Sequence, residues 1–272
     1  MGSEKSLSEP RLLTDEENRK LEHQKITLSE LKISLLQKEA AKNWDKFYKN
    51  NTTKFFKDRH WLLREFQPLQ ILLASSEHTI YFLEVGCGVG NAFFPLMEAA
   101  GSSVFGLACD FSSRAVDFVR QNEQFNTNRM FAFTCDIVQE SIIDKLRVIT
   151  SGIDIMTVLF VLSALDPNEM QRALKNLADV MKCGGKVCVR DYAVNDYAMI
   201  RFGTRNHKIS DRFYVRQDNT KAYFFFMEEL EALFRDAGFK TESLCYKEAK
   251  TENREKQLSV DRYFVQAVFE KL

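Results

Sequence analysis

A glycine-rich segment with an acid in front of it is the part of this chain best suited to chemistry. The segment reads Glu84-Val85-Gly86-Cys87-Gly88-Val89-Gly90, and it lies between an apolar run and a helix-forming stretch. Glycines let the backbone approach a ligand closely, and a helix N-terminus offers free N–H groups and a positive dipole. The spacing differs from the G-x-G-x-x-G pattern tuned to a pyrophosphate. The segment therefore predicts a nucleotide-like ligand, and Glu84 favours one that carries positive charge.

Three further residues stand where they could complete the same site. Asp110 follows the loop by about 20 residues, at the place where a carboxylate holds ribose hydroxyls in nucleotide-binding folds. Asp136 ends the next apolar run and could accept a hydrogen bond from an adenine amino group. Leu159 ends the run after that and would give adenine an apolar wall. Together with the loop, these residues predict S-adenosylmethionine (SAM) and a methyltransferase, with a dehydrogenase as the weaker alternative.

The elements that must position these residues alternate between short apolar runs and helical stretches. Strands are predicted at 80–85, 104–109, 130–135, 153–161 and 186–189, and helices at 93–100, 114–121, 142–146 and 169–181. Such alternation predicts an α/β fold whose mostly parallel sheet has helices on both faces. Right-handed crossovers bring the C-terminal ends of the strands to one edge, so the loop and the acids should meet there. A helix at 225–238 and a hairpin of 241–246 with 263–269 are predicted to complete the fold.

The rest of the chain divides into an extension, a lid and an insertion. Residues 1–40 are polar and are expected to be helical or partly disordered, with at most one amphipathic helix docking elsewhere. Residues 41–78 interleave aromatic and charged residues, and residues 79–272 are expected to form the methyltransferase domain. Within that domain, 192–222 shows no obvious helix, and an irregular segment of this length is often functional.

Composition argues against several classes of protein. Lys+Arg and Asp+Glu both number 38, so no global basic excess indicates nucleic-acid binding, although one face can still be basic. The Cys residues form no Cys-x-x-Cys pair and the His residues are scattered, which argues against a metal site and favours a reducing compartment. No apolar run reaches the ~20 residues of a membrane span, and the polar N-terminus does not read as a signal peptide. We expect a cytoplasmic protein with neither metal nor membrane, and the nucleus as the alternative compartment.

Separated motifs along the chain resemble those of a known enzyme family. They are Phe55–Trp61, Leu83–Asn91, Cys109–Ser112, Phe160–Ala164, Arg190–Tyr192 and Phe213–Asp218. The chain resembles the methyltransferase-like enzymes that make N3-methylcytidine in tRNA, and is most similar to the cytosolic branch that acts on serine tRNAs. The resemblance runs from about Leu13 to the C-terminus. It implies a class I SAM-dependent methyltransferase fold, which is Rossmann-like, with a mostly parallel seven-stranded sheet and a C-terminal antiparallel hairpin.

The resemblance also implies a cofactor, a substrate and a partner. SAM is the expected cofactor, a cytidine of the anticodon loop the expected acceptor, and seryl-tRNA synthetase the expected partner protein. Trp44 and Tyr48 would fold over the cofactor, which would be surrounded by Glu84, Gly86, Gly88, Asp110, Asp136, Ile137 and Leu159. Asn219 and Ser113 depart from the family, where Gly and Pro are usual. The first departure could alter a turn, because Asn adopts positive φ less freely than Gly.

The chemistry implied for this acceptor needs alignment more than a strong base. Cytosine N3 is neutral and carries an in-plane lone pair, so the enzyme must align N3 with the methyl carbon and the sulfur. The methylated base is a cation, and Asp191 is the candidate catalytic carboxylate that would stabilise it. Pairing with Arg190 or capping of the next segment is an equally weighted alternative for Asp191. The sequence Phe160–Ser163 lacks the Asn/Asp-Pro-Pro-aromatic motif typical of exocyclic amine methylation.

Two basic and aromatic segments are the candidates for RNA contact. The N3 atom lies on the Watson–Crick edge, so the base must be unpaired, and unpaired loops are bound by stacking and by cations on phosphates. The candidate residues are Lys57, Arg59, His60, Arg190, Arg201, Arg212 and Arg216. Phe55, Phe56 and Trp61 are expected to anchor their segment to the core. The alternatives are a small-molecule or protein methyltransferase in which 192–222 is a substrate lid, and a non-catalytic SAM-binding adaptor.

Overall fold

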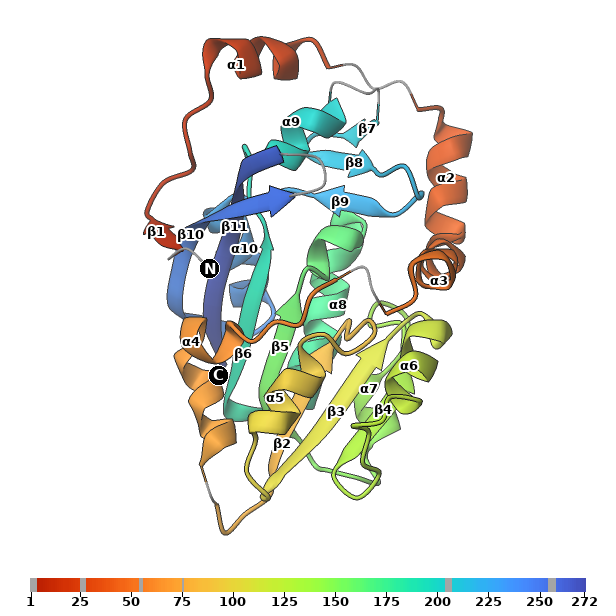
Figure 1. Cartoon of the computed structure of the whole chain (residues 1–272), viewed down its shortest axis with the longest axis vertical. Helices are drawn as coiled ribbons and strands as arrows, with labels where there is room; N and C mark the ends of the chain where they lie inside the picture. Colours follow the sequence, from red (N-terminus) through yellow and green to blue (C-terminus); the bar gives the residue numbers. More distant parts are fainter. Residues whose placement is uncertain (1–3, 25–27, 54–55, 75, 204–206, 254–257) are drawn as a thin grey trace.

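The apolar runs predicted as strands form the centre of an eight-stranded sheet with the order β1-β10-β11-β6-β5-β2-β3-β4. The computed structural model describes residues 4–24, 28–53, 56–74, 76–203, 207–253 and 258–272. The parallel part consists of β2 (Ile80–Val85), β3 (Val104–Asp110), β4 (Met130–Thr134), β5 (Ile153–Leu159) and β6 (Met181–Tyr192). Strands β2, β3 and β5 contain no exposed residue because helices cover both faces of the sheet, as Figure 1 shows.

Each face of the sheet has its own apolar core. One core includes side chains of α7 (Ile142–Leu146), α8 (Pro167–Val180) and α10 (Met227–Asp236). The other includes side chains of α4 (Leu62–Glu65), the 3₁₀ helix η1 (Gln67–Leu73), α5 (Phe93–Ala99) and α6 (Ser113–Arg120). Capping side chains define where the helices start: the Ser112 hydroxyl accepts from the N–H of Ala115, and the Asp166 carboxylate accepts from that of Asn168. The predicted α/β fold is therefore confirmed.

The C-terminal hairpin is longer than the sequence predicts. Its strands are β10 (Phe239–Asn253) and β11 (Leu258–Lys271), and β11 runs antiparallel to β6. The charged stretch predicted as a connecting loop continues the ladder, since Glu252 pairs with Ser259. Alternating charges left no apolar pattern to read, and backbone pairing with the partner strand decides the structure there.

The N-terminal residues contain both helices and a strand. They form β1 (Lys5–Leu7), α1 (Asp15–Glu22) and α2 (Glu30–Lys38), which precede α3 (Ala40–Asn51). The strand β1 pairs antiparallel with β10 and adds an eighth strand to the seven that were predicted. A three-residue strand of polar composition carries no periodicity, so the sequence could not reveal it.

The insertion at 192–222 was predicted to lack a helix, and that prediction is wrong. It contains α9 (Tyr197–Gly203) and a separate sheet of β7 (Lys208–Ser210), β8 (Phe213–Val215) and β9 (Lys221–Tyr223). Aromatic and small side chains form a core of its own: Ala198, Met199, Tyr214, Ala222 and Phe224. The turn between β8 and β9 places Asn219 at φ 64°, and the Asn219 N–H donates to the Arg216 carbonyl at 3.0 Å. Asparagine thus adopts the positive φ that this turn requires.

Candidate cofactor and RNA site

The glycine loop joins β2 to α5 at the C-terminal edge of the parallel sheet. Gly86, Gly88 and Gly90 have φ of 63°, 53° and 91°, a region that side chains disfavour. A Cβ on Gly86 would lie 2.4 Å from Val161 Cγ2, so a larger residue there has no space. The Asp110 carboxylate at the end of β3 accepts from the N–H groups of Gly88 and Ser112, both at 2.9 Å. Loop and acid are therefore one hydrogen-bonded unit.

The predicted cofactor residues line two adjoining cavities at this edge, which we call the inner and the outer cavity. The inner cavity is lined by Trp44, Tyr48, Gly86, Asp110, Asp136 and Ile137 among others. The outer cavity has a volume of about 380 Å³ and is lined by Glu84, Gly88 and Leu159 together with Trp44, Tyr48 and Gly86. The two cavities share Trp44, Tyr48, Gly86 and Phe160. The structure thus brings together every residue proposed for the cofactor.

Buried thiols at three neighbouring strand ends also line these cavities, where the sequence predicts small buried apolar residues. Cys109 and Cys135 line the inner cavity, and Cys87 lines the outer one. Burial raises the pKa of the Cys135 thiol to about 12, and burial also raises the pKa values of Cys87 and Cys109. The thiols are therefore protonated at neutral pH and act as small apolar wall residues.

Glu84 is a buried carboxylate with an unused oxygen. Its side chain is 3% exposed, and its Oε2 has no hydrogen-bond partner among the described residues. Burial raises its pKa to about 8, with Arg59 acting in the opposite direction. A buried acceptor without a partner is costly, and a cationic ligand would satisfy it. This group fits the ammonium that SAM carries.

Helix α3 covers the cofactor region with aromatic rings. Trp44 and Tyr48 stack with their ring centroids 5.9 Å apart, and Phe47 packs edge-on against both. The Ser112 hydroxyl donates to the Asp45 carboxylate at 2.5 Å, which ties α3 to the start of α6. The lid predicted from Trp44 and Tyr48 is thus fastened to the end of β3.

Arginine and aromatic side chains surround the outer cavity. Arg59 lies over the Phe160 ring at 4.9 Å, Arg190 over Trp61 at 3.9 Å, Arg216 over Tyr192 at 5.4 Å and Arg262 over Phe264 at 5.4 Å. Arg216 also donates from Nη2 to the Tyr192 hydroxyl at 3.1 Å. Guanidinium groups stacked on aromatic rings bind phosphates and unpaired bases well.

Phe160 lies between the two cavities in an unusual backbone conformation. Its φ is 62°, a region that costs a non-glycine residue about 1–3 kcal/mol. The Phe160 N–H donates to the Arg190 carbonyl at 2.8 Å, and its ring packs 5.2 Å from Tyr192 and 5.5 Å from Phe264. The strained residue therefore forms part of the wall of both compartments.

The candidate RNA residues fall into three groups. Lys57, Arg59, Arg190 and Arg216 line the outer cavity. His60 and Arg201 are exposed outside it, with the Arg201 guanidinium 5.2 Å from the Phe202 ring. Arg212 instead pairs with Glu229 at 2.7 Å and donates to the Phe224 carbonyl at 3.3 Å. Its contacts hold β8 to α10, so the structure gives Arg212 a structural role and argues against RNA contact.

Asp191 is not among the lining residues of either cavity, although its neighbours Arg190 and Tyr192 line the outer one. Its side chain is fully buried, and its carboxylate accepts from the backbone N–H groups of Ser163 at 3.0 Å and Tyr192 at 2.8 Å. Burial raises its pKa to about 6, and the hydrogen bonds from Ser163 and Tyr192 act in the opposite direction. The two hydrogen bonds match the capping alternative, and the catalytic role of Asp191 stays a prediction.

Comparisons with known proteins agree with this site. A family model described as "Methyltransferase domain" matches residues 83–187. The mouse protein named tRNA N(3)-cytidine methyltransferase METTL6 is 44% identical over 96% of this chain and 91% of its own length. The chain belongs to the tRNA N(3)-cytidine methyltransferase family. Another member, tRNA N(3)-methylcytidine methyltransferase trm141 of Schizosaccharomyces pombe, is 42% identical over 90% of this chain and 98% of its own length.

Solved structures place the fold of this protein among the class I SAM-dependent methyltransferases. A SAM-dependent methyltransferase from Anabaena variabilis aligns with a TM-score of 0.64 at 10% identity, covering 85% of this chain and 95% of that one. Magnesium protoporphyrin IX methyltransferase from Synechocystis with bound SAH aligns with a TM-score of 0.51 at 14% identity, covering 94% of each chain. The enzyme uses SAM as its cofactor, and the unpartnered Glu84 oxygen suits that ligand.

The described residues of this protein contain neither a membrane-spanning helix nor a metal-binding cluster. Within those residues, no helix has the length and apolar character to cross a membrane. The same residues include no group of three or more His, Cys, Asp or Glu side chains placed to hold a metal ion.

Proposed function

We propose that this chain transfers a methyl group from SAM to N3 of a cytidine in the anticodon loop of tRNA. The observation that carries the proposal is that the inner and outer cavities adjoin. The inner cavity holds the residues proposed for the cofactor, and the outer cavity is lined by arginine and aromatic side chains. The two cavities share Trp44, Tyr48, Gly86 and Phe160. The relatives named as tRNA N(3)-cytidine methyltransferases support the same acceptor.

The outer cavity has the side chains that an unpaired base requires. The rings of Phe160, Tyr192 and Phe264 lie 5.2–6.2 Å from one another and can stack on a base taken out of its helix. Arg59 and Arg216 line the same cavity and can hold flanking phosphates. The chemistry needs an aligned acceptor, because the N3 lone pair is free without a general base.

Charge in the site favours the donor and the product. SAM supplies a methyl group on a positively charged sulfur, and the unpartnered Oε2 of Glu84 supports a role for this residue in holding the SAM ammonium group. The Glu84 carboxyl group lines the outer cavity, whereas Asp191 is not among its lining residues. When ionised, Glu84 can also stabilise the positive charge that the base acquires.

We also propose serine tRNAs as the substrates and seryl-tRNA synthetase as the partner, in the cytoplasm, with the nucleus as the alternative. Resemblance of the sequence motifs to the serine-specific branch supports this finer assignment. Threonine tRNAs are the natural comparison substrate, because the relative from Saccharomyces cerevisiae named tRNA(Thr) (cytosine(32)-N(3))-methyltransferase is 36% identical over 90% of this chain, which covers 39% of that protein.

The test is methylation of defined tRNAs by the purified chain. Serine and threonine tRNA transcripts are incubated with SAM, with and without seryl-tRNA synthetase, and digested for nucleoside mass spectrometry. We expect N3-methylcytidine in serine tRNA, and none when the target cytidine is replaced by uridine. Methyl transfer to a protein or small molecule without RNA would support the alternative enzyme class. SAM binding without transfer under either condition would support the adaptor.

A further inference from the structure

The first described residues form an N-terminal strap, residues 4–22, that runs from the edge of the main sheet to α9 (Figure 1). It pairs with β10 through β1 alone, with Lys5 opposite Glu248 and Leu7 opposite Tyr246. Helix α1 buries no residue, and only Leu7 and Leu21 of the strap pack against an apolar core. The strap is therefore attached with little hydrophobic burial.

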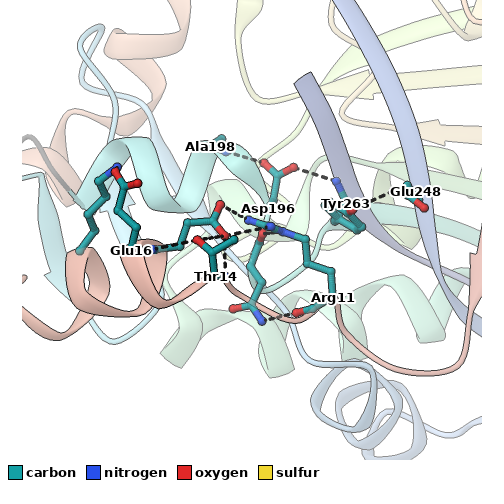
Figure 2. Close-up of polar contacts among 10 residues, drawn as sticks. Arg11, Thr14, Glu16, Asp196, Ala198, Glu248 and Tyr263 are labelled. Atoms are coloured by element: carbon teal, nitrogen blue, oxygen red, sulfur yellow. Dashed lines mark hydrogen bonds and ion pairs between the residues drawn. The ribbon is translucent and has the colours of Figure 1, made fainter. Parts of the chain in front are cut away.

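Polar contacts hold the middle of the N-terminal strap, as Figure 2 shows around Arg11. Arg11 donates from Nε to the Asn195 carbonyl at 2.7 Å, and Asn195 donates back from Nδ2 to the Arg11 carbonyl at 2.8 Å. Arg11 also pairs with Glu17 at 2.6 Å and lies 5.3 Å from the Tyr263 ring. Contacts of this kind are partly solvated and weaken with salt, so releasing the strap uncovers little apolar surface beyond that covered by Leu7 and Leu21.

The N-terminal strap begins inside the outer cavity. Glu4 makes a two-pronged ion pair with Arg190, with Oε1–Nη1 at 3.1 Å and Oε2–Nη2 at 2.8 Å. Both residues line the outer cavity, and Arg190 is only 1% exposed. The guanidinium is thus closed off by a carboxylate that belongs to the chain itself.

Arg190 has other partners that remain when Glu4 leaves. It donates to the Gln266 side-chain oxygen, from Nε at 2.8 Å, and it lies 3.6 Å from the Glu65 carboxylate and over the Trp61 ring. Glu65 is itself paired with Lys247 at 3.0 Å. Departure of Glu4 would therefore leave the arginine oriented and partly neutralised, and would free Nη1 and Nη2 from their ion pair with Glu4.

We propose that the Arg190 end of the outer cavity is a phosphate-binding subsite, which Glu4 fills in the RNA-free protein and yields to a phosphodiester of the RNA substrate. The inference rests on the proposed function. A carboxylate and a phosphate bind guanidinium through the same pair of parallel hydrogen bonds, so each can take the other's place. The N-terminal strap then acts as a competitor that RNA must displace.

The test compares Glu4→Gln with Glu9→Gln, which removes the same charge from an exposed position on the same strap. A labelled anticodon stem–loop is titrated by fluorescence anisotropy at several salt concentrations, and SAM binding is measured separately. We expect the Kd for RNA to fall about three- to tenfold in Glu4→Gln, since the competing charge-assisted pair is weakened. The slope of log Kd against log salt should steepen by about 0.7, as one more counterion is released. SAM affinity and the Glu9→Gln protein should be unchanged.

A second measurement uses inorganic phosphate as the probe and needs no RNA. At constant ionic strength, phosphate should raise the Tm of Glu4→Gln more than that of the wild type or Glu9→Gln. If Glu4→Gln binds RNA no more tightly than wild type and gains no stability from phosphate, Glu4 is a fixed structural partner and the inference is wrong. If phosphate stabilises Glu4→Gln while the wild type neither binds nor methylates tRNA, the subsite stands and the proposed function fails.

Discussion

Replacing Glu84 with Gln should stabilise the ligand-free enzyme and weaken its binding of SAM. Burial raises the pKa of Glu84 to about 8 from an ordinary value of 4.5, so folding favours the protonated acid. The contribution of Glu84 to the free energy of unfolding is therefore most favourable below pH 4.5. It is lost progressively as the pH rises from 4.5 to 8. Each pH unit in that window costs about 1.4 kcal/mol, so the need to keep Glu84 protonated in the folded state lowers the stability of the ligand-free protein by roughly 3 kcal/mol at pH 7.

The loss of SAM affinity follows from the same burial. A charge-assisted hydrogen bond contributes about 1.5–3 kcal/mol, so the variant should bind SAM about 10- to 100-fold more weakly. Isothermal titration calorimetry gives the affinity, and thermal or urea unfolding of the ligand-free protein gives the stability. Between pH 6 and 8 the wild type should lose stability relative to Glu84→Gln. This window lies above the pKa values of about 6 to which Asp110 and Asp191 are raised, so Glu84 dominates the pH dependence there. Exposed Glu98 supplies the control variant Glu98→Gln, which should change neither quantity.

One pair of results would refute the reasoning. If Glu84→Gln keeps the wild-type SAM affinity within twofold and unfolds at a lower temperature than wild type at pH 7, the carboxylate is neither strained in the free protein nor used by the cofactor. The unpartnered Oε2 would then have to be satisfied by solvent.

The remaining predictions concern the loop, the insertion and Asp191. Gly88→Ala should cost about 1 kcal/mol or more of stability and weaken SAM binding roughly tenfold by calorimetry, because φ is 53° and the new Cβ would lie 2.9 Å from the Tyr48 hydroxyl. Asp191→Asn should lower the free energy of urea unfolding by about 1–3 kcal/mol while the folded fraction keeps most of its kcat; a large loss of kcat at unchanged stability would restore the catalytic assignment. Arg216→Lys should raise the Kd for RNA several-fold in anisotropy titrations without changing SAM affinity, because lysine cannot both stack on Tyr192 and reach its hydroxyl.

The sequence by itself determined the cofactor half of the site. The glycine loop and the residues that end the following strands, Asp110, Asp136 and Leu159, are close in space because parallel strands joined by right-handed crossovers end at one edge. The topology of the sheet decides that these residues lie close together, and the alternation of apolar runs and helical stretches in the sequence predicts that topology. The motif resemblance extended this reading to Trp44 and Tyr48, which lie on a helix outside the sheet.

Only the tertiary structure decided the roles of the charged residues outside that loop. Arg190, Arg212 and Arg216 look alike in the sequence, yet one faces Glu4, one pairs with Glu229 and one stacks on Tyr192. Glu4 and Arg190 are 186 positions apart, and no local pattern records their meeting. A charged side chain takes its role from whatever packs against it, and that neighbour is chosen by the fold of the whole chain. The short strands of the insertion and β1 were hidden for the same reason, because segments of three residues are held by their partners and carry no periodicity of their own.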